Sequence, residues 1–314
     1  MHLYLITGGA GFIGSNIAHE LVRRGEKVRI VDNFSTGSMR NISDIFDRIE
    51  LIEADVRDLE SMRRAMEGVD FVLHQAALPS VARSVSDPIA TSEVNISGTL
   101  NMLVAARDAG IKRFVYAASS SAYGNTPALP KREDMEPCPL SPYAVSKLAG
   151  EHYCRIFYQL YGLETVSLRY FNVFGPGQDP LSQYSAAIPK FVTSMFEGKP
   201  ITVYGNGNQS RDFTYVQNVV NANLLACKSP DLKGEVMNIA CGNGISLNQL
   251  ISALEEIMSV RANVIRTDPR AGEVLHSCAD ISKARAWIGY EPAITFNEGL
   301  SKTVKWFANG HRDI

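Results

Sequence analysis

The first half of the chain alternates between short apolar runs and longer stretches with helical periodicity. The apolar runs predict buried strands at residues 2–7, 27–32, 49–53, 71–75, 113–118 and 164–170. The periodic stretches predict helices at residues 11–24, 58–66, 88–108 and 141–161. Continuously apolar strands that alternate with helices are typical of a parallel sheet covered on both faces. We therefore expect an α/β fold with a doubly wound parallel sheet.

The pattern changes after residue 171. Gly, Pro, Gln and Asn concentrate in FGPGQDPLSQYS and VYGNGNQS, which we interpret as irregular loops that face a ligand. Helical periodicity returns at residues 216–226, 247–258 and 297–307, and residues 236–240 form a short strand expected to rejoin the first sheet. We therefore expect a first domain of residues 1–170 plus 214–240. A smaller, discontinuous α/β domain would consist of residues 171–213 plus 241–314.

Composition places the chain among ordinary globular proteins. Its 314 residues are 45% hydrophobic and 20% charged, which excludes a disordered, collagen-like or coiled-coil chain. The net charge of −2 favours neither nucleic acid nor an anionic membrane, so we expect neither partner. The apolar runs are too short to cross a bilayer, and no basic leader precedes MHLYLITGG. Five widely spaced cysteines fit neither a disulfide framework nor a zinc site, so we expect a reduced, cytoplasmic protein without a metal.

Glycines gather between the first expected strand and the first expected helix. The segment TGGAGFIG places Gly8, Gly11 and Gly14 there. Gly8 permits a tight turn, Gly11 lets the backbone approach a pyrophosphate, and Gly14 lets the helix pack on the strand. The amides at the helix N-terminus then favour phosphate groups. This arrangement predicts a dinucleotide-binding domain of the Rossmann type.

An acidic residue ends the second expected strand. Asp32 lies near the spacing of about 20 residues at which a carboxylate binds the adenosine ribose hydroxyls. Its carboxylate would repel a 2′-phosphate, and no Arg or Lys follows at once in NFSTG, so we expect NAD rather than NADP. Asp55 in EADVRD either reaches the adenine or caps a helix over residues 57–66, and the sequence leaves both interpretations open.

A tyrosine and a lysine stand four residues apart in SPYAVSK, on an expected helix. Tyr143 and Lys147 therefore share one helix face, where the ammonium and a nicotinamide ring would lower the pKa of the phenol. Earlier in the chain, an expected strand ends in the hydroxyls of Ser119, Ser120 and Ser121. One of them could bridge a substrate and Tyr143, or they could simply form a turn or a helix cap. Together with the glycine turn, these residues predict a catalytic constellation.

These motifs resemble those of extended short-chain dehydrogenase/reductases, in particular the nucleotide-sugar 4-epimerases. The segments that carry the resemblance cover essentially the whole chain: TGGAGFIGS, DNFSTG, HQAA, ASSSAYG, SPYAVSK, RYFNVFGPGQ, SRDFTYV and RAGEVLHSCADISKA. The resemblance implies an isomerase that holds NAD tightly and regenerates it in each cycle. A UDP-hexose would be oxidised to a 4-keto sugar, turn about its diphosphate linkage and be reduced on its other face.

The resemblance also assigns roles to residues. It makes Tyr143 the acid and base, Lys147 its pKa tuner and ribose anchor, and Ser119 the catalytic hydroxyl. For the cofactor it implies Gly8, Gly11, Phe12, Ile13, Gly14, Asp32, Asn33, Ser35, Thr36, Gly37, Asp55, Val56, Gln75, Ala76, Ala77, Asn95, Tyr143, Lys147, Tyr170 and Val173. For the substrate it implies Ser80, Ser119, Ser120, Ser121, Tyr143, Asn172, Ala187, Ile188, Val203, Tyr204, Arg211, Arg270, Glu273 and Ser277.

Within the substrate set the resemblance distinguishes several contacts. Arg211 and Arg270 would clamp the diphosphate, a bidentate role that suits guanidinium groups. Glu273 would bind the uridine ribose. The residues expected to flank the uracil are Val203 and Tyr204.

Departures from related patterns narrow the reaction. Dehydratases that resemble this chain carry an Asp-Glu pair where it has Ser120 and Ser121, which disfavours dehydration. Decarboxylating relatives act on uronic acids and usually bring an extra Arg near GPGQDP, where this chain has Gly177 and Asp179. The uronate reading is weakened but stays open, because Arg83 could serve a carboxylate.

Ser277 bears on the choice of sugar. In the resembled family a bulky Tyr at this position blocks an N-acetyl group, so Ser277 favours UDP-GlcNAc/UDP-GalNAc and would also admit UDP-Glc/UDP-Gal. Pro79, where the acetyl-preferring subgroup often has Gly, could narrow the pocket. The alternatives are an epimerase restricted to plain sugars, a UDP-uronate 4-epimerase, and an NAD(H) sensor without activity. Such sensors typically lack the Tyr-Lys pair.

Two expected helices carry apolar residues that suggest a partner. They are residues 88–108 and 141–161, with Leu100, Leu103, Leu148, Ile156 and Leu160 among the apolar positions. In relatives the equivalent helices pair as a four-helix bundle, so the resemblance implies a homodimer. Burial against the sheet would explain part of the same stripe.

Overall fold

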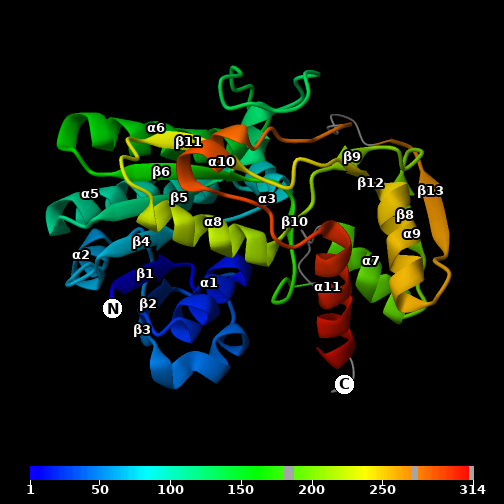
Figure 1. Ribbon diagram of the computed structural model, residues 1–314, viewed down its shortest axis with the longest axis horizontal. Coiled ribbons are helices and arrows are strands. Elements are labelled where there is room, and N and C mark those ends of the chain that lie inside the picture. The colour runs from blue at the N-terminus through cyan, green and yellow to red at the C-terminus, as the bar shows by residue number, and fades with distance from the viewer. Residues whose placement is uncertain (180–186, 270–274, 311–314) are drawn as a thin grey trace.

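The computed structural model describes residues 1–179, 187–269 and 275–310. Its centre is a seven-stranded parallel sheet in the order β11-β6-β5-β4-β1-β2-β3 (Figure 1). The strands are β1 (Leu3–Thr7), β2 (Lys27–Asp32), β3 (Glu50–Glu53), β4 (Phe71–His74), β5 (Arg113–Ser119), β6 (Thr165–Tyr170) and β11 (Glu235–Ile239). The chain order reverses beside β1, which pairs with both β2 and β4. The predicted doubly wound α/β fold is confirmed, and this reversal is where such sheets bind ligands at their carboxyl edge.

Side chains alternate between two apolar layers, one on each face of the sheet. On β5, Phe114 and Tyr116 enter one layer and Val115 enters the other. The first layer packs under α2 (Leu59–Ala65), α5 (Thr99–Ala109) and α6 (Pro142–Tyr161). The second layer packs under α1 (Phe12–Arg23) and α8 (Val216–Lys228). Burial of both faces explains why the strands read as continuous apolar runs.

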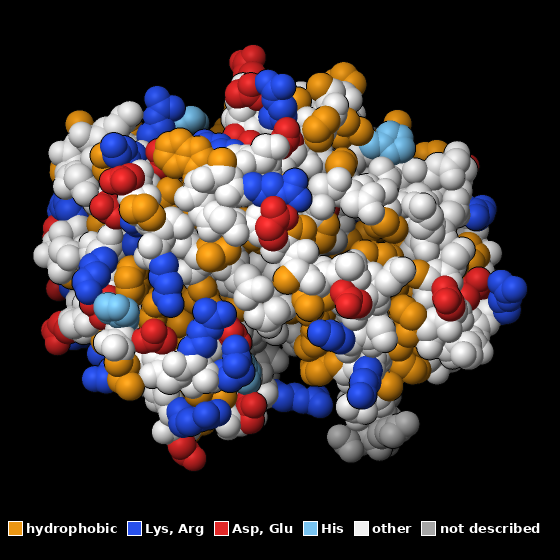
Figure 2. Space-filling view, viewed as in Figure 1, with side chains coloured by type: hydrophobic (Ala, Val, Ile, Leu, Met, Phe, Trp, Pro, Cys, Tyr) orange, Lys and Arg blue, Asp and Glu red, His pale blue; other side chains and the backbone are white. Residues whose placement is uncertain are grey.

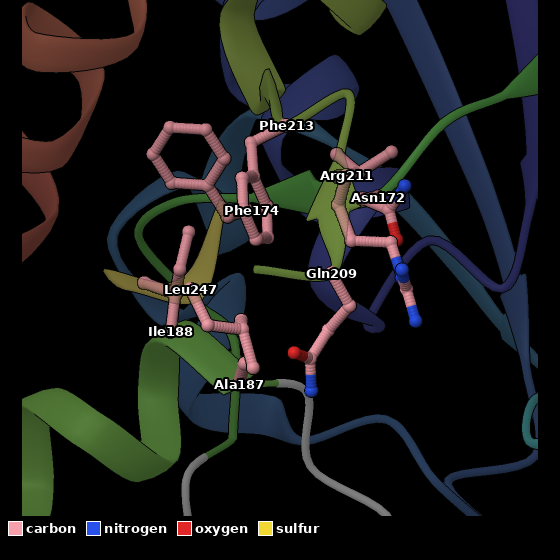
Figure 3. Close-up of a pocket in the computed structure, with 9 residues that line it drawn as sticks. Asn172, Phe174, Ala187, Ile188, Gln209, Arg211, Phe213 and Leu247 are labelled. Atoms are coloured by element: carbon pink, nitrogen blue, oxygen red, sulfur yellow. The ribbon is translucent and has the colours of Figure 1, made fainter. Parts of the chain in front are cut away.

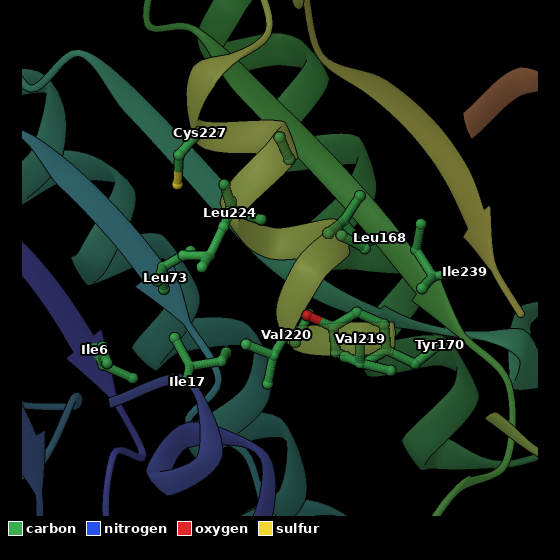
Figure 4. Close-up of a cluster of buried hydrophobic side chains, with 14 of the residues drawn as sticks. Ile6, Ile17, Leu73, Leu168, Tyr170, Val219, Val220, Leu224, Cys227 and Ile239 are labelled. Carbon is green, nitrogen blue, oxygen red and sulfur yellow. The ribbon is translucent and has the colours of Figure 1, made fainter. Parts of the chain in front are cut away.

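Helix α8 returns to the first sheet after the chain has left it. Figure 4 shows its side chains Val219, Val220 and Leu224 facing Leu168 and Ile17, so the helix fills the space between β6 and α1. It is followed by β11, which extends the sheet at β6 in parallel. The strand expected at 236–240 therefore joins the sheet as predicted, shifted by one residue.

The helix expected at 88–108 is interrupted. The structure has α4 (Pro88–Ser92), a π-helical turn η3 (Glu93–Gly98) and then α5. Gly98 accounts for the close packing of this turn, because a Cβ atom there would lie 2.6 Å from Cγ2 of Val56. Hydrophobic periodicity does not reveal a single extra residue in a helical turn, and π-helical turns are frequent at functional sites.

A second lobe is built from short pairs of strands and three larger helices (Figure 1). Its strands are β7 (Val173–Phe174) with β10 (Thr214–Tyr215), β8 (Ile201–Tyr204) with β13 (Val264–Thr267), and β9 (Ser210–Arg211) with β12 (Ile245–Ser246). Its helices are α7 (Ala187–Phe196), α9 (Leu247–Met258) and α11 (Phe296–Gly310). A separate apolar core, including Phe174, Phe191 and Leu254, holds this lobe together.

Several short elements complete the chain, and none of them was predicted. They are α3 (Val81–Ser86), α10 (Ser282–Ile288), η1 (Met39–Asn41), η2 (Ser43–Arg48) and η4 (Ser120–Tyr123). Across the described ranges, no helix combines the length and apolar character that a membrane span requires. The face drawn in Figure 2 carries basic and acidic side chains interspersed.

A buried carboxylate ties three separate segments together. Asp212, fully buried between β9 and β10, accepts hydrogen bonds from the backbone amides of Cys241 at 2.9 Å, Gly242 at 3.0 Å and Ala279 at 3.1 Å. Burial raises the pKa of Asp212 to about 6, against the opposing effect of these amides. The loop after β11 and the segment before α10 are therefore fastened to the strand that follows Arg211.

We expect Asp212→Asn to lower the free energy of unfolding by about 1–3 kcal/mol, because an amide NH₂ would face a backbone N–H. The wild-type carboxyl binds its proton more tightly when folded, so its contribution to stability grows as the pH falls through about 6. Chemical denaturation at a series of pH values, compared with Asp212→Asn, measures both effects. An equal dependence on pH in both proteins would contradict the second expectation.

Candidate active site

The turn between β1 and α1 has no room for side chains. Gly8 has a φ of +66°, and a Cβ atom there would lie 2.8 Å from the backbone of Ala76. A Cβ atom on Gly14 would lie 2.2 Å from the carbonyl oxygen of Gly8. Gly11 occupies the N-cap of α1, and no side chain caps the helix. The amides of the first turn, at Phe12, Ile13 and Gly14, are thus left for an anionic ligand.

Asp32 lies at the end of β2 and braces the glycine turn. Its carboxylate is buried and accepts hydrogen bonds from the amides of Ala10 at 2.9 Å and Phe34 at 2.8 Å. A Cβ atom on Gly37 would lie 2.9 Å from one of its oxygens, so the following loop also passes close by. The neighbouring positions expected to contact the cofactor are Asn33, Ser35 and Thr36, all exposed. Burial raises the pKa of Asp32, and the amide donors oppose this effect.

Asp55 does not cap a helix. Helix α2 begins at Leu59 and is capped by Asp58, so the capping interpretation of Asp55 is wrong. Asp55 instead accepts hydrogen bonds from Asn33 at 2.8 Å and from both Nε and Nη2 of Arg57. Arg57 holds the pKa of Asp55 at about 2. The adjacent Val56 is buried against Gly98.

The end of β4 is held by a chain of hydrogen bonds through His74. Thr99 donates its hydroxyl to the carbonyl of Asn95, so it accepts from Nε2 of His74, and Nδ1 then accepts from Thr7. Burial lowers the pKa of His74 to about 3, which keeps the ring neutral. The hydroxyl of Thr7 in turn accepts from the amide of Ala76, beside the glycine turn.

Beyond His74, Gln75 belongs to a partly buried amide and phenol network. Its side chain contacts the hydroxyl of Tyr170 at 3.2 Å and the side chain of Asn223 at 3.2 Å. Asn223 on α8 had no sequence signal, because it lies far along the chain in an ordinary amphipathic helix. Ala77 follows and is partly buried. This network joins the carboxyl ends of β4 and β6.

Asn95, in the π-helical turn, clasps the next loop. Its side-chain amide accepts from the backbone N–H of Leu78 at 2.8 Å and donates to the carbonyl of the same residue at 3.2 Å. It also donates to Ser146 on α6 at 3.1 Å. Ser80, two residues on, has a φ of +99° and caps α3. Backbone strain of this kind is concentrated at functional sites.

The Tyr143 and Lys147 side chains lie on the inner face of α6. Ser141 caps this helix and Pro142 follows at its first position, which explains why it starts here. Lys147 is buried, donates from Nζ to the carbonyl of Ala117 at 2.9 Å, and lies 5.0 Å from the ring centre of Tyr116. Burial lowers the pKa of Lys147 to about 8.

Ser119 is the hydroxyl that the structure brings to Tyr143. It lowers the pKa of the Tyr143 phenol. Ser121 donates to Ser119 from both its amide at 3.2 Å and its hydroxyl at 2.9 Å, which leaves the proton of Ser119 for another acceptor. The cap of η4 and the contact with Tyr143 are therefore made by the same residue. Ser120 is partly buried in η4.

Burial and hydrogen bonding act in opposite directions on Tyr143. Burial raises the pKa of its phenol, and the interaction with Ser119 lowers it. The net direction is upward, opposite to the shift expected from Lys147. A phenolate near neutral pH therefore requires a further positive charge at the site.

A cavity of about 230 Å³ lies in the second lobe, next to the segment that follows β6. Figure 3 shows Phe174, Phe213, Ile188 and Leu247 on its apolar side, and Asn172, Arg211 and Gln209 on its polar side. Of the expected substrate residues, it brings together Asn172, Ala187, Ile188 and Arg211, and Val173 of the expected cofactor set also lines it. Gln209, Phe213, Phe174 and Leu247 were missed, because a pocket assembled from distant loops leaves no local motif.

Other expected substrate residues lie elsewhere in the second lobe. Val203 is buried in its apolar core and Tyr204 is partly buried at the end of β8, and neither lines the cavity. Ser277 lies beside β9, where its amide donates to the carbonyl of Ser210 at 3.0 Å. Arg270 and Glu273 lie outside the described residues.

The glycine turn fits a dinucleotide. A cradle that a Cβ atom would fill, an uncapped helix N-terminus and the acidic Asp32 provide what a pyrophosphate and a ribose need. Across the residues that the structure describes, no group of three or more His, Cys, Asp or Glu could hold a metal ion. The fold and the glycine turn thus define the class as a dinucleotide-binding protein of the Rossmann type.

Comparison with known proteins identifies the family. Residues 4–240 match the NAD dependent epimerase/dehydratase family, and the chain belongs to it. Its NAD dependence is thereby established. The fold resembles UDP-N-acetylglucosamine 4-epimerase from Methanobrevibacter ruminantium M1, solved with UDP-N-acetylmuramic acid, at 38% identity and a TM-score of 0.94, covering 98% of this chain and 99% of that one.

Two further solved structures are similar over their full length. UDP-glucose 4-epimerase from Thermotoga maritima, solved with UDP-glucose, is 37% identical with a TM-score of 0.94, covering 98% of this chain and 99% of that one. UDP-glucuronic acid 4-epimerase from Bacillus cereus, solved with UDP-glucuronic acid and NAD, is 32% identical with a TM-score of 0.91 and the same coverage.

The lowered pKa of Lys147 predicts that its ammonium is lost above about pH 8 in protein freed of nucleotide. Carbon NMR of protein labelled at the lysine ε-carbon should show a resonance that titrates near this pH and is missing in Lys147→Met. The buried Lys131, whose pKa is also lowered, is assigned in the same way with Lys131→Met. Titration of Lys147 near the ordinary value of about 10.4 would contradict the expectation.

Proposed function

We propose that the protein is an NAD-dependent UDP-sugar 4-epimerase. The observation that carries the proposal is the interaction of Ser119 with Tyr143, whose pKa it lowers, with the buried ammonium of Lys147 one helical turn away. Ser119 ends β5 at the carboxyl edge of the sheet, the same edge at which the glycine turn follows β1. Relatives over the full length are 4-epimerases of UDP-sugars, which supports the same reaction here.

The residues of this chain transfer one proton between the sugar and Tyr143. Tyr143 takes the proton of the sugar 4-hydroxyl on its phenol oxygen and later returns it. The proton of Ser119 stabilises the phenolate, and Lys147 adds a positive charge. NAD, when bound, supplies the acceptor and donor of the hydride from carbon 4. Phe12, Ile13 and Gly14 would hold its pyrophosphate with their amides, beside Asp32 for the ribose.

The cavity suits the nucleotide half of the substrate. Its apolar side offers Phe213 and Leu247 to a base, and its polar side offers the Arg211 guanidinium to a diphosphate. We include Arg270 and Glu273, predicted from the sequence, as further contacts of the diphosphate and the ribose. An anchored UDP leaves the hexose able to present either face to Tyr143, as 4-epimerisation requires.

The small side chain of Ser277 favours a sugar with an N-acetyl group. Its backbone is fixed, because Ser277 bonds to Ser210 and the next two residues bond to Lys131 and Asp212. The size of the side chain therefore decides the space beside the sugar. We propose UDP-GlcNAc/UDP-GalNAc as the preferred pair, with UDP-Glc/UDP-Gal also accepted. The M. ruminantium relative is named for the same N-acetyl sugar.

A UDP-uronate is the second candidate. Arg83 lies on α3, whose cap Ser80 belongs to the expected sugar site, so a guanidinium is within the same short helix. The B. cereus relative is a UDP-glucuronic acid 4-epimerase. Dehydration is disfavoured, because Ser120 and Ser121 follow Ser119 where an acid would be needed.

Incubation of the purified protein with UDP-GlcNAc, without added NAD, should yield UDP-GalNAc, and Tyr143→Phe should lose at least about a hundredfold in rate. UDP-Glc should be converted as well, and UDP-glucuronic acid slowly or not at all. Product analysis by chromatography measures all three. Conversion of UDP-glucuronic acid alone would contradict the proposed substrate and favour a UDP-uronate 4-epimerase.

Ser277→Tyr tests the sugar preference separately. Added bulk should reduce turnover of UDP-GlcNAc at least about tenfold and leave UDP-Glc turnover within about threefold of wild type. Ser277→Ala is the matched control and should retain both activities. Equal losses on both sugars would show that this position does not select the sugar.

We also propose a homodimer. Helix α6 exposes Val145, Ile156 and Leu160 on its outer face, and the Leu160 side chain is 68% exposed to solvent. The neighbouring α3 and α4 expose Val81, Val85 and Ile89. Leu103, part of the expected stripe, is fully buried under the sheet and cannot contribute, whereas Leu100 and Leu148 are partly buried. A second copy that covers this apolar face would complete a four-helix bundle.

Ile156→Glu combined with Leu160→Glu should convert a dimer to a monomer, because charges would be buried at the interface. Light scattering during gel filtration measures the mass. Val260→Glu, at an exposed apolar site after α9, is the control and should leave the mass unchanged. A wild-type monomer would refute the dimer without bearing on the proposed reaction.

A further inference from the structure

The face of β6 that lies under α6 is polar. Thr165, Ser167 and Arg169 all point to that side and are buried. On the neighbouring β5 the corresponding side chains, such as Phe114 and Ala118, are apolar. A polar strand in the middle of a buried layer is costly, so it calls for an explanation in terms of what it contacts.

Arg169 forms a buried ion pair with the catalytic helix. Its Nε and Nη2 donate to the two carboxylate oxygens of Glu151 at 2.9 and 2.7 Å, and each side chain is 3% exposed. The guanidinium also lies 4.6 Å from the ring centre of Tyr123. Glu151 comes one helical turn after Lys147 and two turns after Tyr143, so all three occupy one face of α6.

Stability alone is a weak reason for this pair. Removing two charges from water costs about as much as their attraction returns. In addition, Nη1 of Arg169 is buried without a hydrogen-bond partner among the described residues. Apolar side chains of similar volume would fasten α6 to β6 at least as well.

Titratable groups face Lys147 from α6, β5 and β4. On α6 it faces Glu151 and Cys154, on β5 Tyr116, and on β4 His74. Burial keeps the His74 ring neutral and raises the pKa of the Cys154 thiol and the Tyr116 phenol. Glu151 raises the pKa of Lys147, against the effect of burial.

The charged groups that act on Lys147, directly or as an ion-pair partner, are thus Glu151 and Arg169, and with Lys147 they sum to one positive charge. Without Arg169, the carboxylate of Glu151 would cancel the charge of Lys147. Without Glu151, two cations would share one buried layer and the lysine would lose its proton more readily.

We propose that Glu151 and Arg169 are positioning residues which keep Lys147 protonated while leaving its positive charge available to Tyr143. The inference rests on the proposed function, since it concerns the groups that move the proton. Neither residue touches the reacting atoms, and both act through Lys147.

Replacing Glu151 and replacing Arg169 should shift the pKa values of Tyr143 and Lys147 in opposite directions. Glu151→Gln removes a negative charge, so the pKa values of Tyr143 and Lys147 should both fall, by about one pH unit. Arg169→Met removes a positive charge, so both values should rise by a similar amount. The double variant Glu151→Gln/Arg169→Met keeps the sum of charges and should return both values to within about a third of that shift.

The measurement is the ultraviolet absorbance of tyrosinate during a pH titration of the NAD-loaded protein, with Tyr143→Phe in each background to isolate Tyr143. The pH profile of kcat/KM for the UDP-sugar is recorded on the same variants and should move in the same directions. The absorbance reports the ionisation of Tyr143 directly. It therefore tests the effect of the ion pair even where no sugar is epimerised.

The control is a second Arg-Glu pair, at the opposite edge of the sheet. Arg113 at the start of β5 binds Glu164, which precedes β6 at the amino edge of the sheet. Glu164→Gln should leave the titration of Tyr143 unchanged. If the single variants fail to fold, the charge-neutral double variant still tests the proposal. It should show normal activity and a Tyr143 pKa that is not shifted from that of the wild type. Shifts of the same sign in Glu151→Gln and Arg169→Met, or no shift in either, would overturn the proposal.

Discussion

The close contact between the glycine turn and the end of β4 is the constraint from which the site follows. Gly8 lies against the backbone of Ala76 so tightly that no Cβ atom fits, and this brings the N-terminus of α1 to the point where the sheet order reverses. The amides that would hold a pyrophosphate and the strand that ends at Ser119 therefore share one edge of the sheet. Phe12 carries the contact further, because it packs against the core of the second lobe.

Burial of polar groups is the second organising feature. Asp32, Asn95 and Asp212 are each buried and each bind backbone amides of another segment. Such groups cost free energy unless every donor and acceptor is matched, so they define one arrangement of the loops rather than several. The loops that surround the expected substrate are thereby held by the interior of the protein.

Much of the fold and part of the site could be predicted from the sequence. Strands buried on both faces read as apolar runs, and the residues that follow them, such as Ser119, could be placed at one edge. The π-helical turn at Asn95 could not be predicted, because one extra residue leaves the apolar spacing nearly unchanged. The sequence leaves Asp55 open between an adenine contact and a helix cap, and the structure has Asp58 as the cap.

Four residues that line the cavity and the charge pair under α6 escaped prediction for a different reason. Gln209 and Leu247 meet only through the fold, and Glu151 looks like any helical glutamate until Arg169 is seen beneath it. Sequence motifs mark the groups that touch a ligand, whereas the groups that set their charge are chosen by packing. A strand that presents a polar face to an otherwise apolar layer still indicates such a group. On β6 that polar face includes Arg169, which contacts the helix that carries Tyr143 and Lys147.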